Sequence, residues 1–146
     1  MKNRQKITRV LLDIDTIQDY SLLGIVSAEP DYKLSLSINK KLKISLKNNQ
    51  PVEVINEKGS NIIYSRFSDN IGSPEIIYNL ICNKSGNEIL IKKLGKIDYL
   101  LQVHSSHYNI DTDSLAGSLR AIESITAVFV LNPSLIKDKR MHYLIP

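Results

Sequence analysis

The amino-acid sequence predicts an α+β fold in which helices pack on one face of a single layer of largely antiparallel sheet. Two observations lead to this class. The hydrophobic patterns follow one another in the order strand, helix, several strands, helix, strand, which is typical of α+β domains. The apolar residues 97–103 also precede a helical pattern and a further apolar run, which predicts a β-α-β unit with two parallel strands.

Length and composition bound the size of the core. The chain has 146 residues, of which 42% are apolar. A domain of this length buries roughly two thirds of the surface of its unfolded chain. No repeat, low-complexity tract or linker divides the sequence. We therefore expect a single domain over residues 1–146.

The first third of the chain contains a strand, an ambiguous segment and a helix. Residues 7–15 alternate between apolar and polar side chains, which predicts a strand. The apolar run at residues 20–29 is too short to distinguish a helix from a strand, and we favour a helix. Pro30 and Asp31 then suit the start of a helix, and apolar residues at helical spacing extend it over residues 31–43.

A hairpin is predicted in the middle of the chain. Residues 61–68 and 75–83 are rich in Ile and Tyr, and the segment between them contains the Gly, Asn and Pro of a loop. Before this hairpin, residues 47–51 have the composition of a turn and residues 52–55 that of a short strand. Residues 84–87 form the next turn.

The last third contains the β-α-β unit. A buried strand over residues 99–103 is followed by a helix over residues 112–123, with Asp111 or Asp113 as its N-cap, and by a strand over residues 126–131. Together with the first strand and the hairpin, this unit predicts a split β-α-β arrangement, a ferredoxin-like variant with an extra hairpin.

Cysteine usage and the N-terminal residues indicate the compartment. The single cysteine, Cys82, excludes an intrachain disulfide and suits a reducing environment. Arg9 and Asp13 interrupt the apolar centre that a signal peptide would need. No segment approaches the roughly 18 apolar residues of a membrane span. We expect a cytoplasmic protein that does not bind a membrane.

Two groups of residues have the chemistry of metal ligands. Asp13 and Asp15 close the first predicted strand, where an Asp-x-Asp pair can bind magnesium. His104 and His107 are three residues apart and precede two aspartates. Neither group has a second ligand pair at a defined spacing, so we favour a solvated strand end and a polar loop.

Several catalytic motifs are absent from the sequence. It contains no phosphate-binding Gly-x-x-x-x-Gly-Lys loop, no Gly-x-Gly-x-x-Gly turn, no Gly-x-Ser-x-Gly elbow and no His-Glu-x-x-His. We therefore expect no enzymatic activity and no cofactor. Cys82, in an apolar strand pattern with no adjoining cations, is expected to be an inert buried thiol.

The positive net charge suggests an anionic partner, but the excess of Lys over Arg weakens that inference. The formal net charge is +4, but Lys outnumbers Arg 14 to 5, a bias that an A/T-rich genome produces without selection for binding. Lys92, Lys93 and Lys96 are expected to form a basic surface together with a loose basic tail at residues 137–142 and with four lysines on and after the predicted helix at 31–43, namely Lys40, Lys41, Lys43 and Lys47. Stacking faces for single-stranded RNA are available on the hairpin, at Tyr64, Arg66 and Tyr78.

Residues 91–99, Ile-Lys-Lys-Leu-Gly-Lys-Ile-Asp-Tyr, resemble the signature of the IPExxxVDY family, an uncharacterised bacterial family. Asp98 and Tyr99 match the end of the signature, whereas Lys92 and Lys93 replace its Pro and Glu. Further similarity lies in the runs Leu-Gly-Ile-Val-Ser, Asp-Tyr-Lys-Leu and Asn-Lys-Ser, which begin at residues 23, 31 and 83.

This resemblance implies no activity, because the family has none assigned. It directs attention to Asp98, which we expect to hold a backbone amide or a cation at the start of a strand, and to Tyr99, expected to bury its ring with its hydroxyl at solvent. The predicted interaction surface comprises Lys92, Lys93, Lys96, Asp98, Tyr99, Tyr64, Arg66 and Tyr78.

Three functional hypotheses remain open from the sequence. The leading one is a small non-enzymatic interaction or regulatory protein with a protein partner that the sequence does not identify. The second is an RNA-binding accessory protein. The third is a metal-dependent enzyme that uses Asp13 and Asp15, or His104 and His107.

Overall fold

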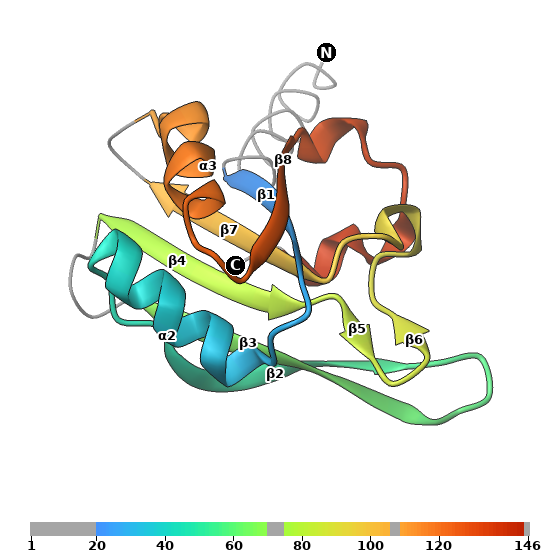
Figure 1. Cartoon of the computed structure of the whole chain (residues 1–146). Helices are drawn as coiled ribbons and strands as arrows, with labels where there is room; N and C mark the ends of the chain where they lie inside the picture. Colours follow the sequence, from blue (N-terminus) through green and yellow to red (C-terminus); the bar gives the residue numbers. More distant parts are fainter. Residues whose placement is uncertain (1–19, 70–74, 106–108, 145–146) are drawn as a thin grey trace, which may run out of the picture.

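A computed structural model of the protein describes residues 20–69, 75–105 and 109–144 (Figure 1). In chain order their elements are β1 (Ser21–Ser27), α2 (Asp31–Leu42), β2 (Lys47–Ile55), β3 (Asn61–Asp69), β4 (Ile76–Cys82), β5 (Lys84–Ser85), β6 (Glu88–Ile89), the 3-10 helix η1 (Lys92–Leu94), β7 (Tyr99–Ser105), α3 (Thr112–Arg120), β8 (Ile125–Leu131) and the 3-10 helices η2 (Pro133–Leu135) and η3 (Lys139–Leu144). The strand predicted over residues 7–15 lies outside the described residues.

The main sheet has six strands in the order β2-β3-β4-β7-β1-β8, and every neighbouring pair is antiparallel. Strands β7 and β8 both pair with β1, which lies between them, so they run in the same direction. The unit β7-α3-β8 is therefore the predicted split β-α-β, and β2-β3 is the extra hairpin of the ferredoxin-like variant. The α+β class predicted from the sequence is confirmed.

The two α-helices cover the same face of this sheet (Figure 1). Leu34 and Ile38 of α2 belong to one buried cluster with Ala116 and Leu119 of α3. On the other face, a second hydrophobic cluster contains side chains of the strands together with Leu90 and Ile91, which lie between β6 and η1, and Leu144 of η3. The expectation of helices on one face thus holds for α2 and α3, whereas η3 packs on the opposite face.

The preference for a helix at residues 20–29 is wrong, because these residues form the central strand β1. Leu22 faces one hydrophobic cluster while Leu23 and Ile25 face the other, so the segment is apolar on both sides and shows no alternation. Gly24 allows a close approach on this strand. A Cβ atom there would lie 2.8 Å from Cδ1 of Ile97.

The predicted turn at residues 47–51 is also wrong, because it forms the first half of β2. This strand lies at the edge of the sheet, where Pro51 can be accommodated although it has no N–H to donate. The pairing of β2 with β3 shifts register between Asn49 and Val52, next to that proline. Polar composition therefore indicated an edge strand here and not a loop.

Most of the other predicted elements are confirmed. Helix α2 spans residues 31–42 and α3 begins at residue 112, where the Asp111 side chain caps it by accepting a hydrogen bond of 3.0 Å from the backbone N–H of Ser114. The predicted hairpin is β3-β4, and the strand expected at 99–103 is the buried strand β7. The turn expected at 84–87 is only partly right, because its first two residues form β5, which pairs with β6. The basic tail expected to be loose instead contains η3, whose Leu144 is buried.

Candidate functional site

Three segments far apart in the sequence enclose a basic cleft at one end of the molecule. They are the turn between β2 and β3, the β6-η1 segment and the residues around the start of η3. The cleft has a smaller hollow of about 120 Å³ and a larger one of about 420 Å³, and Glu57, Lys92 and Arg140 line both. The basic cleft is defined by Asn56, Glu57, Lys58, Glu88, Lys92, Lys93, Lys137, Asp138, Lys139 and Arg140.

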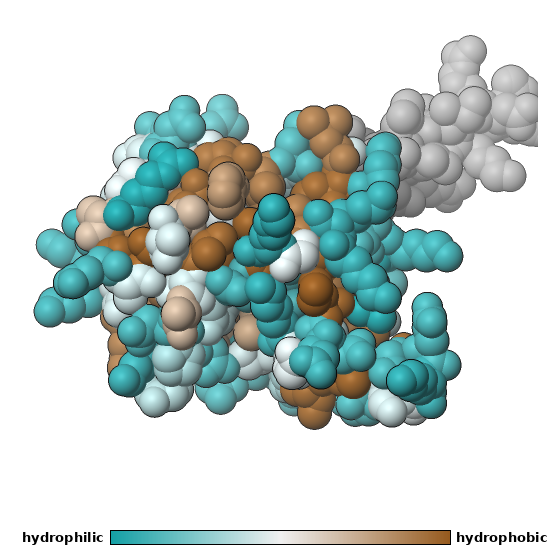
Figure 2. Space-filling model, turned by 45° about the vertical axis from the view of Figure 1, so that its right-hand side comes forward, coloured by the Kyte–Doolittle hydropathy of each residue, from teal (hydrophilic) through white to brown (hydrophobic). Residues whose placement is uncertain are grey.

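Positive charge is in excess in this cleft. Its lining contains six basic and three acidic side chains, a surplus of three, whereas the whole chain has a net charge of +4. Within the described part of the chain, no ion pair shorter than 4.0 Å involves any of these nine side chains. Hydrophilic side chains are prominent on the side of the molecule that faces the viewer in Figure 2. The charges of the cleft are thus available to a ligand.

Hydrogen bonds to the backbone hold the walls of the cleft together. The carboxylate of Asp138 accepts from the backbone N–H of Arg140 at 2.9 Å and from that of Lys93 at 3.3 Å. The guanidinium of Arg140 donates through Nη1 to the carbonyl oxygens of Ile89, at 3.0 Å, and Leu90, at 3.4 Å. Asp138 and Arg140 therefore fasten the C-terminal wall to the β6-η1 wall.

A buried tyrosine hydroxyl lies next to this cleft. Tyr64 is 0% exposed, and its hydroxyl lies beside the guanidinium of Arg140, although the described residues give it no hydrogen bond of the usual distance and angle. Burial raises the pKa of Tyr64 and the charge of Glu88 raises it further, while the charge of Arg140 and its polar contact with the hydroxyl lower it. Two residues further along the same face of β3, the Nε atom of Arg66 is likewise buried without a partner.

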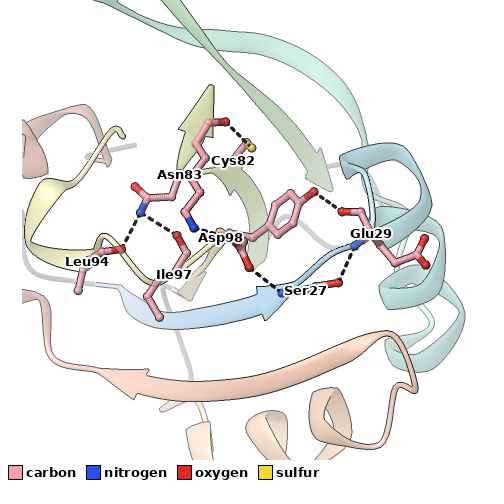
Figure 3. Close-up of polar contacts among 9 residues, drawn as sticks. Ser27, Glu29, Cys82, Asn83, Leu94, Ile97 and Asp98 are labelled. Atoms are coloured by element: carbon pink, nitrogen blue, oxygen red, sulfur yellow. Dashed lines mark hydrogen bonds and ion pairs between the residues drawn. The ribbon is translucent and has the colours of Figure 1, made fainter. Parts of the chain in front are cut away.

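The residues of the family-like signature form a second polar cluster (Figure 3). Asp98 accepts a hydrogen bond of 2.9 Å from the backbone N–H of Ser27 and forms an ion pair of 2.8 Å with Lys84. The hydroxyl of Tyr99 donates to the carbonyl oxygen of Glu29 at 2.6 Å, and burial raises its pKa. The expectation that Asp98 holds an amide or a cation is confirmed, since it holds both. This cluster fastens the start of β7 to the end of β1.

Asn83 is the residue of this region whose importance the sequence did not reveal. It is fully buried, and its side-chain amide donates to the carbonyl oxygens of Leu94, at 2.9 Å, and Ile97, at 3.0 Å (Figure 3). Its amide oxygen accepts from the backbone N–H of Ile91 at 2.8 Å. Asn83 thereby fixes η1, the turn that carries Lys92 and Lys93. The one signal in the sequence was a polar residue that directly follows an apolar strand.

The residues of the predicted interaction surface do not form one surface, because some are exposed and others are buried. Lys92, Lys93 and Lys96 are exposed, and the first two line the basic cleft. Tyr64 and Tyr99 are buried, so their inclusion in an exposed surface is corrected. Both faces of these strands are covered by other parts of the chain. The ring of Tyr99 therefore packs in one hydrophobic cluster and the ring of Tyr64 in the other.

The hairpin residues proposed for stacking do not share a face. Tyr78 packs against the cluster under the α-helices, whereas Tyr64 belongs to the cluster on the other side of the sheet. Tyr78 lies opposite Asp69 in the β3-β4 pairing, and Arg66 lies opposite Ile81. Residues separated by an odd number of positions along β3 point to opposite faces, so Arg66 and Tyr78 face opposite sides.

Among the described residues, the candidate metal ligands and the cysteine form no common site. Asp13, Asp15 and His107 lie outside the described residues. In the ranges that the structure does describe, no group of three or more His, Cys, Asp or Glu side chains could hold a metal ion. Cys82 is half-buried, its thiol contacts the carbonyl oxygen of Lys84 at 2.9 Å, and burial raises its pKa.

No protein-family model matches this chain, and a search of curated proteins finds no relative of it. None of the helices formed by the described residues is long and apolar enough to cross a membrane.

Proposed function

We propose that the protein is a small non-enzymatic interaction domain whose basic cleft binds an acidic segment of a protein partner. The observation that carries the proposal is the surplus of three positive charges, which come from three separate segments and are not neutralised by ion pairs among the described residues. Complementary charge across an interface steers partners together and selects among them.

A protein partner fits the cleft better than RNA does. Recognition of single-stranded RNA depends on bases that stack on exposed aromatic rings. Of the described residues that line the basic cleft, none is aromatic, and Tyr64 and Tyr99 are buried. Glu57, Glu88 and Asp138 interrupt the positive charge, which disfavours a continuous phosphate backbone. RNA remains the second candidate because of the charge surplus.

Membership of the IPExxxVDY family and a cytoplasmic location are parts of the same proposal. The matching residues Asp98 and Tyr99 have fold-stabilising contacts, which supports a family defined by its fold. The departures from the signature, Lys92 and Lys93, both line the cleft, so its charge distinguishes this chain from the family pattern. A single cysteine that forms no intrachain disulfide supports the reducing compartment.

The test is affinity capture from native lysate with the tagged full chain. The bait variant Lys92→Glu/Lys93→Glu reverses two charges in the cleft. The matched control, Lys40→Glu/Lys41→Glu, makes the same change at exposed positions on α2, on the other face of the sheet. We expect a stoichiometric protein that the wild type and the control capture and that the cleft variant loses.

Treatment of the lysate with ribonuclease separates the two candidates. A partner that survives ribonuclease and depends on the cleft supports the proposal. Loss of all captured material after ribonuclease would favour RNA. Equal capture by the cleft variant and the wild type, or an empty capture at endogenous expression, would contradict the proposed function.

A further inference from the structure

We infer that the protein forms a two-fold symmetric dimer in which strand β8 pairs antiparallel with β8 of a second copy of the chain. This inference goes beyond the proposed function and does not rest on it, because β8 contributes no residue to the basic cleft. Strand β8 is one edge of the six-stranded sheet, and among the described residues only β1 pairs with it. An edge of this kind has N–H and C=O groups that a further strand can bind.

The two edges of the sheet differ in their protection against such pairing. The other edge strand, β2, contains Lys47, Pro51 and Glu53, and its pairing with β3 shifts register beside the proline. Charged side chains, proline and bulges are the features by which native edges avoid adding a strand. Strand β8 has the sequence Ile-Thr-Ala-Val-Phe-Val-Leu, without charge or proline. Of the two edges, β8 is therefore the one that can accept a further strand.

Backbone hydrogen bonds show which groups of β8 face away from β1. The carbonyl oxygen of Ile25 in β1 accepts a hydrogen bond of 2.9 Å from the backbone N–H of Asp98, which immediately precedes β7. The main-chain groups of Ile25 therefore face β7. These groups alternate sides along a strand, so those of the neighbouring Gly24 face β8, where Gly24 pairs with Phe129. Phe129 thus binds β1 through its own N–H and C=O groups.

The N–H and C=O groups of Val128 and Val130, the two neighbours of Phe129, consequently face the free edge. The contact of Arg120 supports this orientation, because its Nη2 atom donates to the carbonyl oxygen of Val128 at 2.8 Å. The pairing of β1 with β8 is regular over residues 127–131 and shifts register just before them. Phe129 is the central residue of this regular part.

A two-fold axis beside Phe129 pairs this regular part over its whole length. Phe129 then lies opposite Phe129 of the second copy, and Val128 lies opposite Val130, with which it exchanges two backbone hydrogen bonds. The side chains of Phe129 and Val130 are exposed, and they project from opposite faces of the strand. The dimer covers both of them, and the central pair of phenylalanines is a cross-strand aromatic contact of the kind that stabilises sheets.

A second copy matches this edge along its whole regular length. In the register around Phe129, each opposed pair is apolar: Phe129 with itself, Val128 with Val130, and Ala127 with Leu131. No side chain in this part of the strand is charged, so antiparallel self-pairing brings no like charges together. The edge therefore has the self-complementary surface that a two-fold interface requires.

Arg120 limits the strength of the dimer. Its guanidinium contacts one lone pair of the Val128 carbonyl oxygen, which has a second lone pair for an N–H of the other copy. The symmetry brings two such guanidinium groups to the same interface, where they repel each other. Salt screens this repulsion, so dimerisation should strengthen with ionic strength, whereas binding of an acidic segment to the basic cleft should weaken. Arg120→Met should also strengthen the dimer.

The experiment measures the mass of the full chain by size-exclusion chromatography with light scattering over a series of protein concentrations. We expect the mass to rise from that of one chain, 16.5 kDa, to twice that value. Val130→Lys introduces a charge at the interface and should weaken the dimer at least about tenfold. Val130→Pro should weaken it too, because it removes an outward N–H but no bond to β1. Far-UV circular dichroism checks that each variant folds.

Ile63→Lys is the matched control, because Ile63 of the inner strand β3 is 51% exposed and Val130 is 44% exposed. This variant should leave the dimer unchanged. Lys92→Glu/Lys93→Glu should also dimerise as the wild type does, because the basic cleft is not part of the interface. Loss of the dimer in that cleft variant would assign the association to the cleft and overturn the inference.

A single cysteine tests the position of the two-fold axis. Opposed residues that are not hydrogen-bonded have Cα atoms about 4.5 Å apart, within the range that a disulfide can bridge. Phe129→Cys, in a Cys82→Ser background, should therefore form a covalent dimer in a glutathione redox buffer. Val130→Cys in the same background is the control. It should cross-link far more slowly, because position 130 lies opposite position 128 of the other copy.

A chain that stays monomeric at every concentration would overturn the inference, and slow amide exchange at Val128 and Val130 in such a monomer would assign the edge to another segment. A dimer that survives both Val130 variants, or one that Ile63→Lys weakens equally, would also overturn it. Equal cross-linking of the two cysteine variants would contradict the axis at Phe129.

Discussion

Two buried tyrosines, Tyr99 and Tyr64, differ in the hydrogen bonding of their hydroxyls. Substitution by phenylalanine should therefore change the free energy of unfolding differently at the two positions. The Tyr99 hydroxyl donates to the Glu29 carbonyl oxygen, whereas the Tyr64 hydroxyl is buried beside Arg140 and has no hydrogen bond of the usual distance and angle in the described part of the chain. Tyr99→Phe should lower the free energy of unfolding by about 1–2 kcal/mol, because a hydrogen bond is lost and a carbonyl loses its donor. Tyr64→Phe should leave that free energy unchanged or raise it slightly, because no bond is lost and less polar surface is buried.

Urea denaturation of both variants in buffer without phosphate measures this difference. The two variants carry the same chemical deletion at buried rings, so each is the control for the other. A loss of more than about 1 kcal/mol in Tyr64→Phe would mean that its hydroxyl has a partner in the free protein.

At the residue scale, the sequence predicted side-chain alternation but not which faces are buried. In the structure Tyr64 and Arg66 lie on one face of β3 and Phe67 on the other, as alternation along a strand requires. Both faces are covered, however, one by the two α-helices and the other by the β6-η1 segment and η3. A polar ring on a strand is exposed or buried according to what packs on it, and that depends on distant parts of the chain.

At the element scale, the close approach of β1 to the segment before β7 should be visible as coupling between two residues. A methyl group at position 24 would lie 2.8 Å from Cδ1 of Ile97 and 3.2 Å from its Cγ1 and Cγ2. Gly24→Ala should therefore cost about 1–3 kcal/mol, as overpacking does in a well-packed core. Ile97→Val alone should cost about 0.5–1.5 kcal/mol, because it removes the buried Cδ1 atom.

The double variant Gly24→Ala/Ile97→Val removes the closest contact. Its loss of stability should be smaller than the sum of the two single losses by at least about 0.5 kcal/mol. Chemical denaturation of all four proteins gives the coupling energy. Strict additivity would mean that the backbone of β1 shifts to accept the methyl group without contact with Ile97.

The C-terminal element supplies a second test at this scale, because its packing creates one wall of the cleft. Leu144 of η3 is 1% exposed, whereas Leu135 of η2 is 72% exposed. Leu144→Ala should cost about 2–5 kcal/mol of unfolding free energy, whereas Leu135→Ala should change it by less than about 0.5 kcal/mol. Thermal or urea denaturation of the two leucine variants makes the comparison. A small effect at Leu144 would show that η3 contributes little to folding.

The elements that the sequence predicted correctly have strong local signals, and those it missed depend on their position in the sheet. Helix α3 has an N-cap aspartate and apolar spacing, and the β3-β4 hairpin has a loop rich in turn residues. Strand β1 lacks alternation because it is central, and β2 is polar because it is an edge. The prediction of a loose C-terminal tail was wrong. Although the tail is polar in composition, the buried side chain of Leu144 and the hydrogen bonds of Asp138 and Arg140 attach it to the rest of the chain.

The candidate site could be predicted only in part for the same reason. Lys92 and Lys93 were recognisable as exposed cations, since they follow an apolar strand in a short polar turn. Lys58, Lys137 and Arg140 approach them from segments dozens of residues away. No local pattern reports such a convergence, because it follows from the order of strands and from how η3 packs on the sheet.

At the scale of the whole molecule, one sheet separates two hydrophobic clusters, and the central strands contribute to both. Leu101 and Val103 of β7 belong to the cluster under the α-helices, whereas Leu100 of the same strand belongs to the cluster under η3. If such a strand detaches from the sheet, both hydrophobic clusters lose packing at the same time. That the chain is a single domain remains a prediction, and this arrangement predicts that it unfolds in one cooperative transition.

Two variants on opposite faces test this prediction. Leu119→Ala removes packing under the α-helices, and Leu144→Ala removes packing under η3. In each variant, urea unfolding followed by far-UV circular dichroism and by tyrosine fluorescence should give one midpoint, lower than that of the wild type and the same for both probes. Tyr64 and Tyr99 report on opposite faces, so fluorescence responds to both clusters. A variant in which the two probes separate would show that one face unfolds before the other.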